Sequence, residues 1–334
     1  MNSVSKDIFQ LIFKTPVENF ESAALQVFEF QYKNNPLYQQ FCTAIRIEPA
    51  KIKTPEQIPF LPIGFFKTKK VVSTPFKPET IFKSSGTTGK VCSTHYIKSV
   101  ELYRESFINC FTHFYGPVTN WCIIGLLPSY LEQGNSSLVY MVDELIRKSG
   151  DTNSGFYLHD MVKLEKTLAA NEARKKPTFL IGVTYALLDF ARQHPMTLQN
   201  TTVVETGGMK GRHKELTREE VHDVLKKQLG LNEIHSEYGM TELLSQAWSQ
   251  EKGLFQTPPW MKVMLRSEDD PFNITGKDPV NEIRGAINII DLANYYSCSF
   301  IATDDNGKLQ PDGRFSVLGR LDNSDTRGCG LMWI

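Results

Sequence analysis

The sequence has 334 residues, of which 41% are hydrophobic and 22% are charged, a balance typical of a folded globular protein with room for a large core. The 37 Lys and Arg residues match 37 Asp and Glu residues, which excludes a global field that would attract nucleic acid or an anionic membrane. Any anion binding must therefore be local.

The cysteines and the N-terminal residues indicate in which cellular compartment the protein is expected. The six cysteines form no CxxC pair and no Cys/His spacing of a zinc site. The opening residues MNSVSKDIFQLIF lack the regions of a signal peptide, and no run of 18 apolar residues occurs. We expect a cytoplasmic protein with reduced thiols, no membrane span and no nucleic-acid partner.

Apolar residues recur at helical spacing from residue 5 to about residue 45, and Pro16 and Pro36 interrupt the pattern. This spacing predicts two or three helices. A proline-rich segment follows at residues 49–78 and contains IPFLPIGFFK. Its aromatic run is interpreted as core packing in preference to a ligand site, because apolar side chains are usually interior.

The most informative stretch is IFKSSGTTGKVCSTHYIKS, residues 81–99, in which a short apolar run leads into hydroxyls and glycines closed by Lys90. Backbone amides beside glycines, hydroxyl groups and one ammonium suit phosphate oxygens. The spacing GxxGK followed by Val91 differs from the P-loop of NTPases. A plain surface turn is the alternative, since turns also favour these residue types. The predicted phosphate cradle consists of Ser84, Ser85, Gly86, Thr87, Thr88, Gly89 and Lys90.

Strands and helices alternate from residue 100 to about residue 240, which predicts an α/β domain with much parallel pairing. The turn after residue 127 either faces a substrate, as loops at the carboxyl ends of strands often do, or simply joins strand to helix. Helices are expected at 100–114, 136–149, 161–173, 184–194 and 217–229. Strands are expected at 121–127 and 177–183, at the β-branched start of TTVVETGGMKGR, and within NEIHSEYGMTELLSQ.

The pattern changes after Pro259, where strands are expected at 261–265, 282–291, 299–303 and 308–318. DDNGK and PDGR read as turns, because NG and DG are common in hairpins. The sequence therefore predicts a small antiparallel unit at residues 261–318, after an α/β nucleotide- and acyl-binding core at residues 1–260.

Four motifs in order, SSGTTGK (84–90), YGMTE (238–242), TDDNGKL (303–309) and LGRLD (318–322), resemble the signature set of adenylate-forming enzymes. That superfamily includes acyl-CoA ligases, peptide-synthetase adenylation domains and firefly luciferase. The rest of the sequence resembles the acyl-protein synthetase family of bacterial luminescence over nearly the whole chain. The segments that carry this resemblance include FLPIGFFK, the GGMK at 207–210 and GRLDNSDTRGCG. A further likeness to phenylacetate-CoA ligases leaves CoA open as an acceptor.

The resemblance implies an α/β fold, the large N-terminal domain of an adenylate-forming enzyme. This fold has mixed, largely parallel sheets flanked by helices and a small antiparallel β unit. Full-length ligases continue into a lid domain of roughly a hundred residues. We expect this chain to lack most or all of that lid, with residues 319–334 forming a truncated hinge and tail. The lid's phosphate-contacting lysine would then be missing. Lys210 is a candidate substitute, although a surface lysine is the commoner reading.

The resemblance also implies a role for each matching residue in binding ATP and Mg²⁺. The cradle at 84–90 would wrap the β- and γ-phosphates, and Thr241 would lie near the α-phosphate. Glu242 would hold Mg²⁺, a cation that prefers oxygen ligands. The adenine would be bordered by Gly207, Gly208, Tyr238 and Gly239.

The last two motifs imply the ribose contacts. Asp305 would accept both ribose hydroxyls and Arg320 would contact the ribose, while Asp322 falls at the hinge position. Because TDDNG replaces the usual TGD, Asp304 is an alternative to Asp305.

Adenylation of a carboxylate needs positioning and charge neutralisation, since the carboxylate is already a nucleophile. Lys90, Thr241, Glu242 and Cys329 are the predicted catalytic residues. Cys329 lies between two glycines near Arg327, a setting that favours a reactive thiolate. The resemblance implies that it carries the acyl group as a thioester before transfer to a reductase partner. An ordinary small residue is the alternative for Cys329, and the other five cysteines are read as structural.

The leading hypothesis is ATP-dependent activation of a fatty or other carboxylic acid, followed by acyl transfer to a thiol. One alternative is an acyl-CoA or aryl-CoA ligase with CoA as acceptor. A second alternative is a catalytically silent nucleotide-binding subunit, which the presence of Lys90, Glu242 and Arg320 disfavours.

Overall fold

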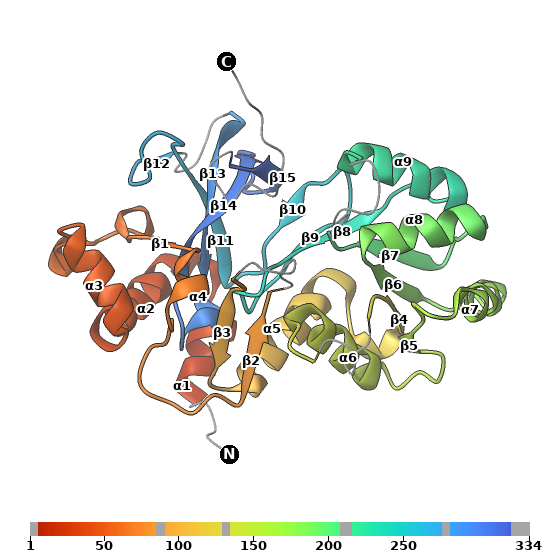
Figure 1. The fold of residues 1–334 in the computed structure, drawn as a ribbon, viewed down its shortest axis with the longest axis horizontal. Coiled ribbons are helices and arrows are strands. Elements are labelled where there is room, and N and C mark those ends of the chain that lie inside the picture. The colour runs from red at the N-terminus through yellow and green to blue at the C-terminus, as the bar shows by residue number, and fades with distance from the viewer. Residues whose placement is uncertain (1–5, 85–90, 129–133, 208–215, 276–280, 322–334) are drawn as a thin grey trace. The chain divides into compact units, whose positions relative to one another are not determined.

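The computed structural model describes residues 6–84, 91–128, 134–207, 216–275 and 281–321. The chain divides into two compact units (Figure 1). The first unit comprises Met1–Lys14 and Phe76–Pro258, and the second unit comprises Thr15–Pro75 and Pro259–Ile334. The domain boundaries expected from the sequence, at residues 260 and 318, stay a prediction.

A largely parallel run of strands forms the centre of the first unit. Strands β5, β4, β6, β7 and β8 pair in parallel in that order, and β9 and β10 continue the run as antiparallel strands. The pattern confirms the predicted mixed, mostly parallel sheet. The strands are β4 (Cys122–Leu126), β5 (Gly155–Phe156), β6 (Thr178–Gly182), β7 (Thr201–Glu205), β8 (His235–Tyr238), β9 (Ala247–Ser249) and β10 (Phe255–Gln256).

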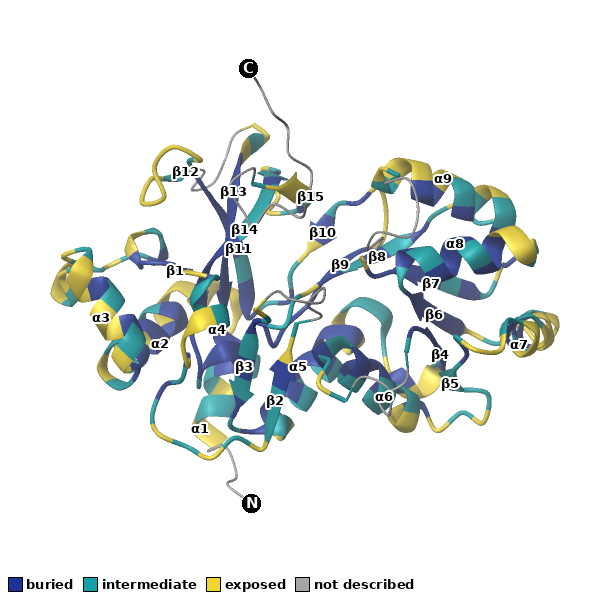
Figure 2. Cartoon of the chain, viewed as in Figure 1, coloured by how far each residue is buried: buried dark blue, intermediate teal, exposed yellow. Residues whose placement is uncertain are grey.

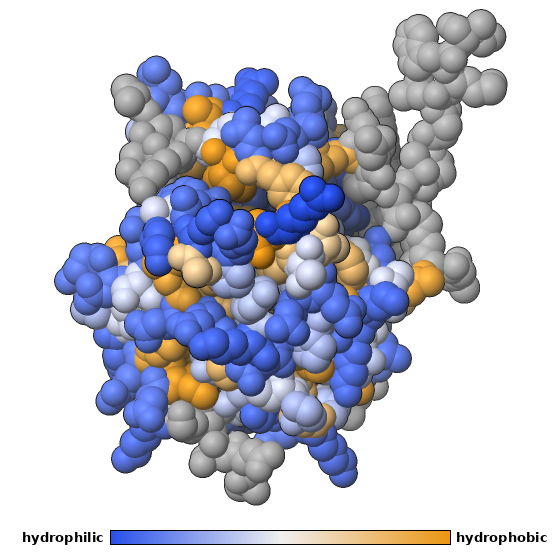
Figure 3. Space-filling model, turned by 90° about the vertical axis from the view of Figure 1, so that its left-hand side faces the viewer, coloured by the Kyte–Doolittle hydropathy of each residue, from blue (hydrophilic) through white to orange (hydrophobic). Residues whose placement is uncertain are grey.

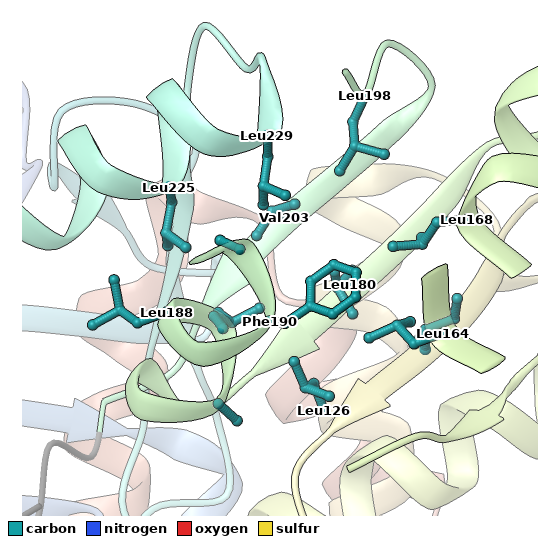
Figure 4. Packing of buried hydrophobic residues seen from close by; sticks show 14 of the residues in the cluster. Leu126, Leu164, Leu168, Leu180, Leu188, Phe190, Leu198, Val203, Leu225 and Leu229 are labelled. Carbon is teal, nitrogen blue, oxygen red and sulfur yellow. The ribbon is translucent and has the colours of Figure 1, made fainter. Parts of the chain in front are cut away.

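Helices cover both faces of these strands because β4 and β6 are apolar on each face. On one face Leu180 packs in a cluster with leucines of the helices that follow β5, β6 and β7 (Figure 4). On the other face Phe179 contacts the rings of Phe111 and Tyr115. Each fully buried leucine or phenylalanine contributes about 1.5–3 kcal/mol. The helices are α5 (Val100–Tyr115), α6 (Ser137–Ser149), α7 (Met161–Ala173), α8 (Thr184–Gln193) and α9 (Arg218–Leu229).

Local signals set the beginnings and ends of these helices. Ser99 and Asp160 cap α5 and α7 through their side-chain oxygens. Thr217 and Glu220 form a capping box at the start of α9, and Gly230 ends that helix in a left-handed conformation. The first unit also contains α1 (Lys6–Phe9), the π-helical turn Gln10–Lys14, the 3₁₀ turn Val118–Asn120, and a hairpin of β2 (Thr80–Lys83) and β3 (Thr94–Ile97).

The second unit contains the predicted antiparallel strands. They pair in the order β12, β11, β13, β14, β15, and the short β1 pairs in parallel with β14. The strands are β1 (Leu61–Pro62), β11 (Met261–Arg266), β12 (Ile274–Thr275), β13 (Ile283–Asp291), β14 (Phe300–Leu309) and β15 (Phe315–Arg320). The helices are α2 (Phe20–Asn34), α3 (Pro36–Ala44) and α4 (Phe65–Thr68), with 3₁₀ turns at Val17–Asn19, Pro49–Lys51, Pro55–Gln57 and Leu292–Asn294.

An aromatic core joins the N-terminal helices to β14 in the second unit. Phe300 contacts the rings of Phe28, Tyr38 and Phe60. The buried amide of Gln31 donates to the carbonyl oxygens of Asn294 and Tyr295, each at 3.0 Å. Phe60, Leu61, Ile63 and Phe66 of IPFLPIGFFK are buried, which confirms that this aromatic run packs in the core.

One predicted turn is wrong. β14 runs through DDNG without a break, and the hairpin to β15 forms only at PDGR, where Gly313 N donates to Gln310 O. The β14 pairing with β13 skips residues instead, since Ala286 faces Asn306 while Asn288 faces Ala302. Pairing on both edges of β14 therefore overrides the local turn signal of Asn306 and Gly307.

Burial follows the expected pattern, with strands buried and helices exposed on one side (Figure 2). Figure 3 shows one face, where hydrophilic residues predominate and hydrophobic ones form small groups. Within the described ranges, none of the helices has the length and apolar character needed to cross a membrane.

Candidate nucleotide and acyl-activation site

The predicted phosphate loop is the connection of the β2–β3 hairpin. Ser84 and Ser93 close its two ends, since Ser84 N donates to Ser93 O at 3.0 Å and Ser93 N donates to Ser84 Oγ at 2.9 Å. Lys83 N also donates to Asn135 O at 2.8 Å, next to the start of α6. Ser84 keeps its hydroxyl proton for an acceptor such as a phosphate oxygen. Residues 85–90, including Lys90, lie outside the described residues.

A buried histidine ties this hairpin to the YGMTE segment. His95 of β3 is 1% exposed, and its Nδ1 lies 2.9 Å from the carbonyl oxygen of Thr241. A carbonyl oxygen only accepts, so Nδ1 carries the proton. Burial lowers the pKa of His95 to about 4, which keeps the ring neutral. Sequence reasoning missed His95, although its place in the alternating β3 pattern marks an inward-facing side chain.

Gly207 follows the end of β7, and Tyr238 is the last residue of the neighbouring β8, so both lie at the carboxyl edge of the parallel run. Glu205 of β7 faces Ser236 of β8 in register, and the next residues continue to Gly207 and Tyr238. Thr206 Oγ1 donates to Glu237 Oε2 at 2.6 Å, which fixes the two segments to each other. Open α/β sheets bind ligands at this edge. The structure thus brings together two segments that the resemblance assigned to the adenine, and Gly208 lies outside the described residues.

The two glutamates at this edge were not singled out by sequence reasoning. Burial, and secondarily the nearby Glu205 carboxylate, raise the pKa of Glu237 to about 7, and the bond from Thr206 opposes that rise. The Glu205 carboxylate accepts from the Thr184 hydroxyl at the start of α8. The Glu237 side chain also favours glycine at position 239, because a Cβ at that position would lie 2.3 Å from Glu237 Oε1. The Tyr238 ring is buried and packs 5.8 Å from the Phe255 ring.

Glu242 lies in the loop of residues 239–246 that joins β8 to β9, and residues 242–246 of this loop are buried. Three contacts hold the loop: the His95 bond, a hydroxyl pair of Ser106 and Ser245 at 3.0 Å, and Cys110 Sγ to Gln246 O at 3.3 Å. Buried polar backbone must be satisfied in this way. Glu242 is 6% exposed and is therefore one of the buried residues of this loop.

The described side chains could bind Mg²⁺ only together with a nucleotide, as follows. Among the residues that the structure describes, no three His, Cys, Asp or Glu side chains gather as a metal site. Mg²⁺ in nucleotide enzymes usually takes one or two carboxylates together with phosphate oxygens and water. Glu242 can supply one such carboxylate, with the remaining ligands coming from a nucleotide.

The predicted ribose residues are neighbours in the second unit. Asp305 of β14 faces Arg320 of β15 in register, and Arg320 Nε lies 3.9 Å from Asp305 Oδ1. A second irregularity lies beside them, because Asn306 faces Gly319 while Gly307 faces Val317. Gly319 has φ +148°, which explains the glycine before the arginine in LGRLD. Asp304 contributes its carbonyl oxygen to Leu321 N at 2.9 Å.

Three of the described thiols, those of Cys42, Cys122 and Cys298, are poor nucleophiles. Burial raises the pKa of Cys42 to about 12 and also raises that of Cys298 and of Cys122. Cys110 is buried, and Cys92 is partly exposed. The structural interpretation of the buried cysteines is thus supported, and Lys210, Asp322 and Cys329 lie outside the described residues.

Solved structures of adenylate-forming enzymes share this fold. The chain is similar to 2-hydroxyisobutyryl-CoA ligase in the postadenylation state (TM-score 0.60, 11% identity, covering 96% of this chain and 73% of that one). It is similar to ATP-bound MatB from Rhodopseudomonas palustris (0.52, 14%, covering 72% and 47%). It is also similar to the long-chain-fatty-acid-CoA ligase FadD1 from Archaeoglobus fulgidus (0.50, 14%, covering 72% and 51%).

These likenesses show that the chain has the fold of these solved structures, and they confirm the predicted fold class. This chain spans about half the length of MatB and of other solved proteins that it matches. A comparison with curated protein sequences found no match. The model of the acyl-protein synthetase family, LuxE, matches residues 4–333, and the chain belongs to that family. The predicted family is thereby confirmed.

Proposed function

We propose that this protein activates a carboxylic acid, a fatty acid by preference, as an acyl-adenylate and then transfers the acyl group to a thiol. The observation that carries the proposal is the match to the acyl-protein synthetase family over residues 4–333. A family of that name joins an acyl group to protein. The fold is one whose solved members include ATP-bound and postadenylation states.

Within each of the two compact units, we assign the site residues to the parts of ATP that they would bind. In the first unit, residues 84–90 bind the β- and γ-phosphates, Thr241 lies near the α-phosphate and Glu242 holds Mg²⁺. The adenine is assigned to the strand ends at Gly207, Gly208, Tyr238 and Gly239. In the second unit, Asp305 and Arg320 bind the ribose. The cross-strand pairing of Asp305 with Arg320 supports the ribose assignment. The hydrogen bond from Thr206 to Glu237 supports the adenine assignment, because it joins the two strand ends.

Adenylation then requires positioning more than acid–base catalysis. A carboxylate oxygen of the acid attacks the α-phosphorus in line, the bond from that phosphorus to the bridging oxygen breaks, and pyrophosphate leaves. Lys90 and the loop amides offset negative charge on the phosphates. Bound Mg²⁺ would neutralise further charge there. The His95 bond holds Thr241 and hence the start of the Glu242 loop in place.

The acyl acceptor is assigned to Cys329. Its thiolate attacks the acyl carbon, AMP leaves with the electron pair of the broken acyl–phosphate bond, and a thioester forms. Burial raises the pKa of Cys42, Cys122 and Cys298, so these thiols are poor candidates. The thioester would be delivered to a cytoplasmic partner of the acyl-reductase type.

The test is acyl labelling of the whole chain. The protein is incubated with ATP, Mg²⁺ and a radiolabelled fatty acid, and hydroxylamine-labile label is counted after denaturation. We expect Cys329→Ser to abolish the label and Cys92→Ser to retain it; Cys92 is a partly exposed cysteine that follows the phosphate loop in the sequence. Full labelling of Cys329→Ser would exclude this carrier. Release of AMP that requires added CoA in both proteins would identify CoA as the acceptor instead.

A further inference from the structure

The strand that carries Asp305 contains a β-bulge larger than the usual two residues against one. Ala286 faces Asn306 and Asn288 faces Ala302, so a single residue of β13, Ile287, stands opposite three residues of β14, Thr303 to Asp305. A bulge bends a strand and re-aims side chains, and bulges are frequent beside active sites. The bulge therefore determines where Asp304 and Asp305 point.

Such a bulge leaves backbone groups without their ladder partners, and a buried arginine satisfies them. Arg266 is the last residue of β11 and is 8% exposed. Its Nη1 donates to Ile287 O at 2.9 Å, and its Nη2 donates to Thr303 O at 2.6 Å. The two carbonyls lie on opposite sides of the bulge, so one guanidinium bridges them.

Neighbouring side chains complete the arrangement. Arg266 Nη1 also donates to Asn288 Oδ1 at 2.6 Å. The Thr303 hydroxyl donates to Ile287 O at 2.8 Å and accepts from Asp305 N at 3.2 Å. A chain of hydrogen bonds thus runs from Arg266 through the Thr303–Ile287 pair to the backbone of Asp305. All of these residues belong to the second unit.

A buried guanidinium is costly unless its donors are paired, and a plain antiparallel ladder would need no arginine here. Gly285 shows that the strands are fitted closely around it, because a Cβ at Gly285 would lie 2.5 Å from Arg266 O. Among the described residues, Arg266 donates hydrogen bonds to two backbone carbonyls and one side-chain amide oxygen, so its burial is compensated without a hydrogen-bonded carboxylate. Asp304 is the nearby acidic group and raises the pKa of Arg266, which burial lowers more strongly.

We propose that Arg266 is a positioning residue for nucleotide recognition: by bridging Ile287 O and Thr303 O it sets the bulge that presents Asp305 to the ribose hydroxyls. The inference rests on the proposed function, in which Asp305 binds the ribose. Arg266 does not itself touch the nucleotide. Its removal should therefore weaken recognition of the ribose and leave recognition of the other parts of ATP in place.

The test measures ribose discrimination by the full chain, the ratio of the dissociation constants for 2′,3′-dideoxy-ATP and ATP with Mg²⁺, obtained by calorimetry. Hydrogen bonds to a carboxylate predict a wild-type ratio of about tenfold or more. Arg266→Met should bring the ratio close to 1, chiefly by weakening ATP. Arg284→Met is the matched control, since Arg284 is an exposed arginine on neighbouring β13, and should keep the wild-type ratio.

The variant Asp305→Asn tests the premise that Asp305 binds the ribose, separately from the inference that Arg266 positions Asp305. If Asp305→Asn and Arg266→Met both lose discrimination, the inference stands. If Asp305→Asn loses it and folded Arg266→Met keeps it, Arg266 has no positioning role although the ribose assignment holds. If Asp305→Asn keeps it, the ribose assignment and the inference both fail. A general loss of stability would not change the ratio. Should Arg266→Met not fold, Thr303→Val carries the same test, because it removes the hydroxyl that binds Ile287 O and Asp305 N.

Discussion

The buried histidine beside Thr241 gives a pH dependence that can be isolated with one substitution. The pKa of His95 is about 4 in the folded chain, against 6.5 for an exposed histidine. The unfolded chain therefore binds a proton in this range that the folded chain does not. The free energy of unfolding is at its full value above pH 6.5 and falls as the pH drops toward 4.

The size of the effect follows from the two pKa values. Between pH 7 and pH 5, His95 should cost about 2 kcal/mol of stability. His95→Asn removes the titration while its side-chain amide can still donate to Thr241 O. His222 and His235, whose pKa values burial also lowers to about 4, remain in both proteins and cancel in the comparison.

Urea denaturation followed by tryptophan fluorescence at pH 7, 6 and 5 makes this comparison. We expect the wild type to lose about 2 kcal/mol more than His95→Asn over that range. His95→Leu, which leaves the carbonyl of Thr241 without this donor, should cost about 1–3 kcal/mol at pH 7. Equal losses of stability from pH 7 to pH 5 in the wild type and in His95→Asn would refute the buried, neutral histidine.

Three further predictions concern packing, a carboxyl group and the metal. Gly307→Ala should destabilise by about 1–3 kcal/mol in thermal unfolding, because the new Cβ would lie 2.6 Å from Ser316 O, whereas Gly64→Ala meets no atom within 4 Å and should be nearly neutral. Glu237→Gln should raise the melting temperature more at pH 8 than at pH 4.5, since a carboxyl with a pKa near 7 destabilises the fold as it ionises. Glu242→Gln should weaken the Mg²⁺ dependence of ATP binding, measured by calorimetric titration with and without the metal.

Elements with strong local patterns could be predicted from the sequence. The sequence pattern predicted helices at 161–173 and 217–229, where α7 and α9 lie, and the apolar runs at residues 121–127 and 177–183 predicted the two central strands β4 and β6. These elements obey their own periodicity, so no distant partner is needed to recognise them.

Features set by distant partners could not be predicted. DDNG reads locally as a turn, yet β13, β15 and Arg266 hold it in a bulged strand. The bond from His95 to Thr241 spans 146 residues of sequence, and no local signal indicates it. The raised pKa of Glu237 likewise depends on its burial and on Glu205 of the neighbouring strand.

Acid-dependent exchange of radiolabelled pyrophosphate into ATP tests the central claim most directly, because only reversible formation of an acyl-adenylate produces it. With Mg²⁺ and a panel of fatty and other carboxylic acids, the wild-type protein should exchange label with at least one acid, and Glu242→Gln should lower that rate by about 100-fold or more. A protein that binds ATP but exchanges no label with any acid in the panel would contradict the account.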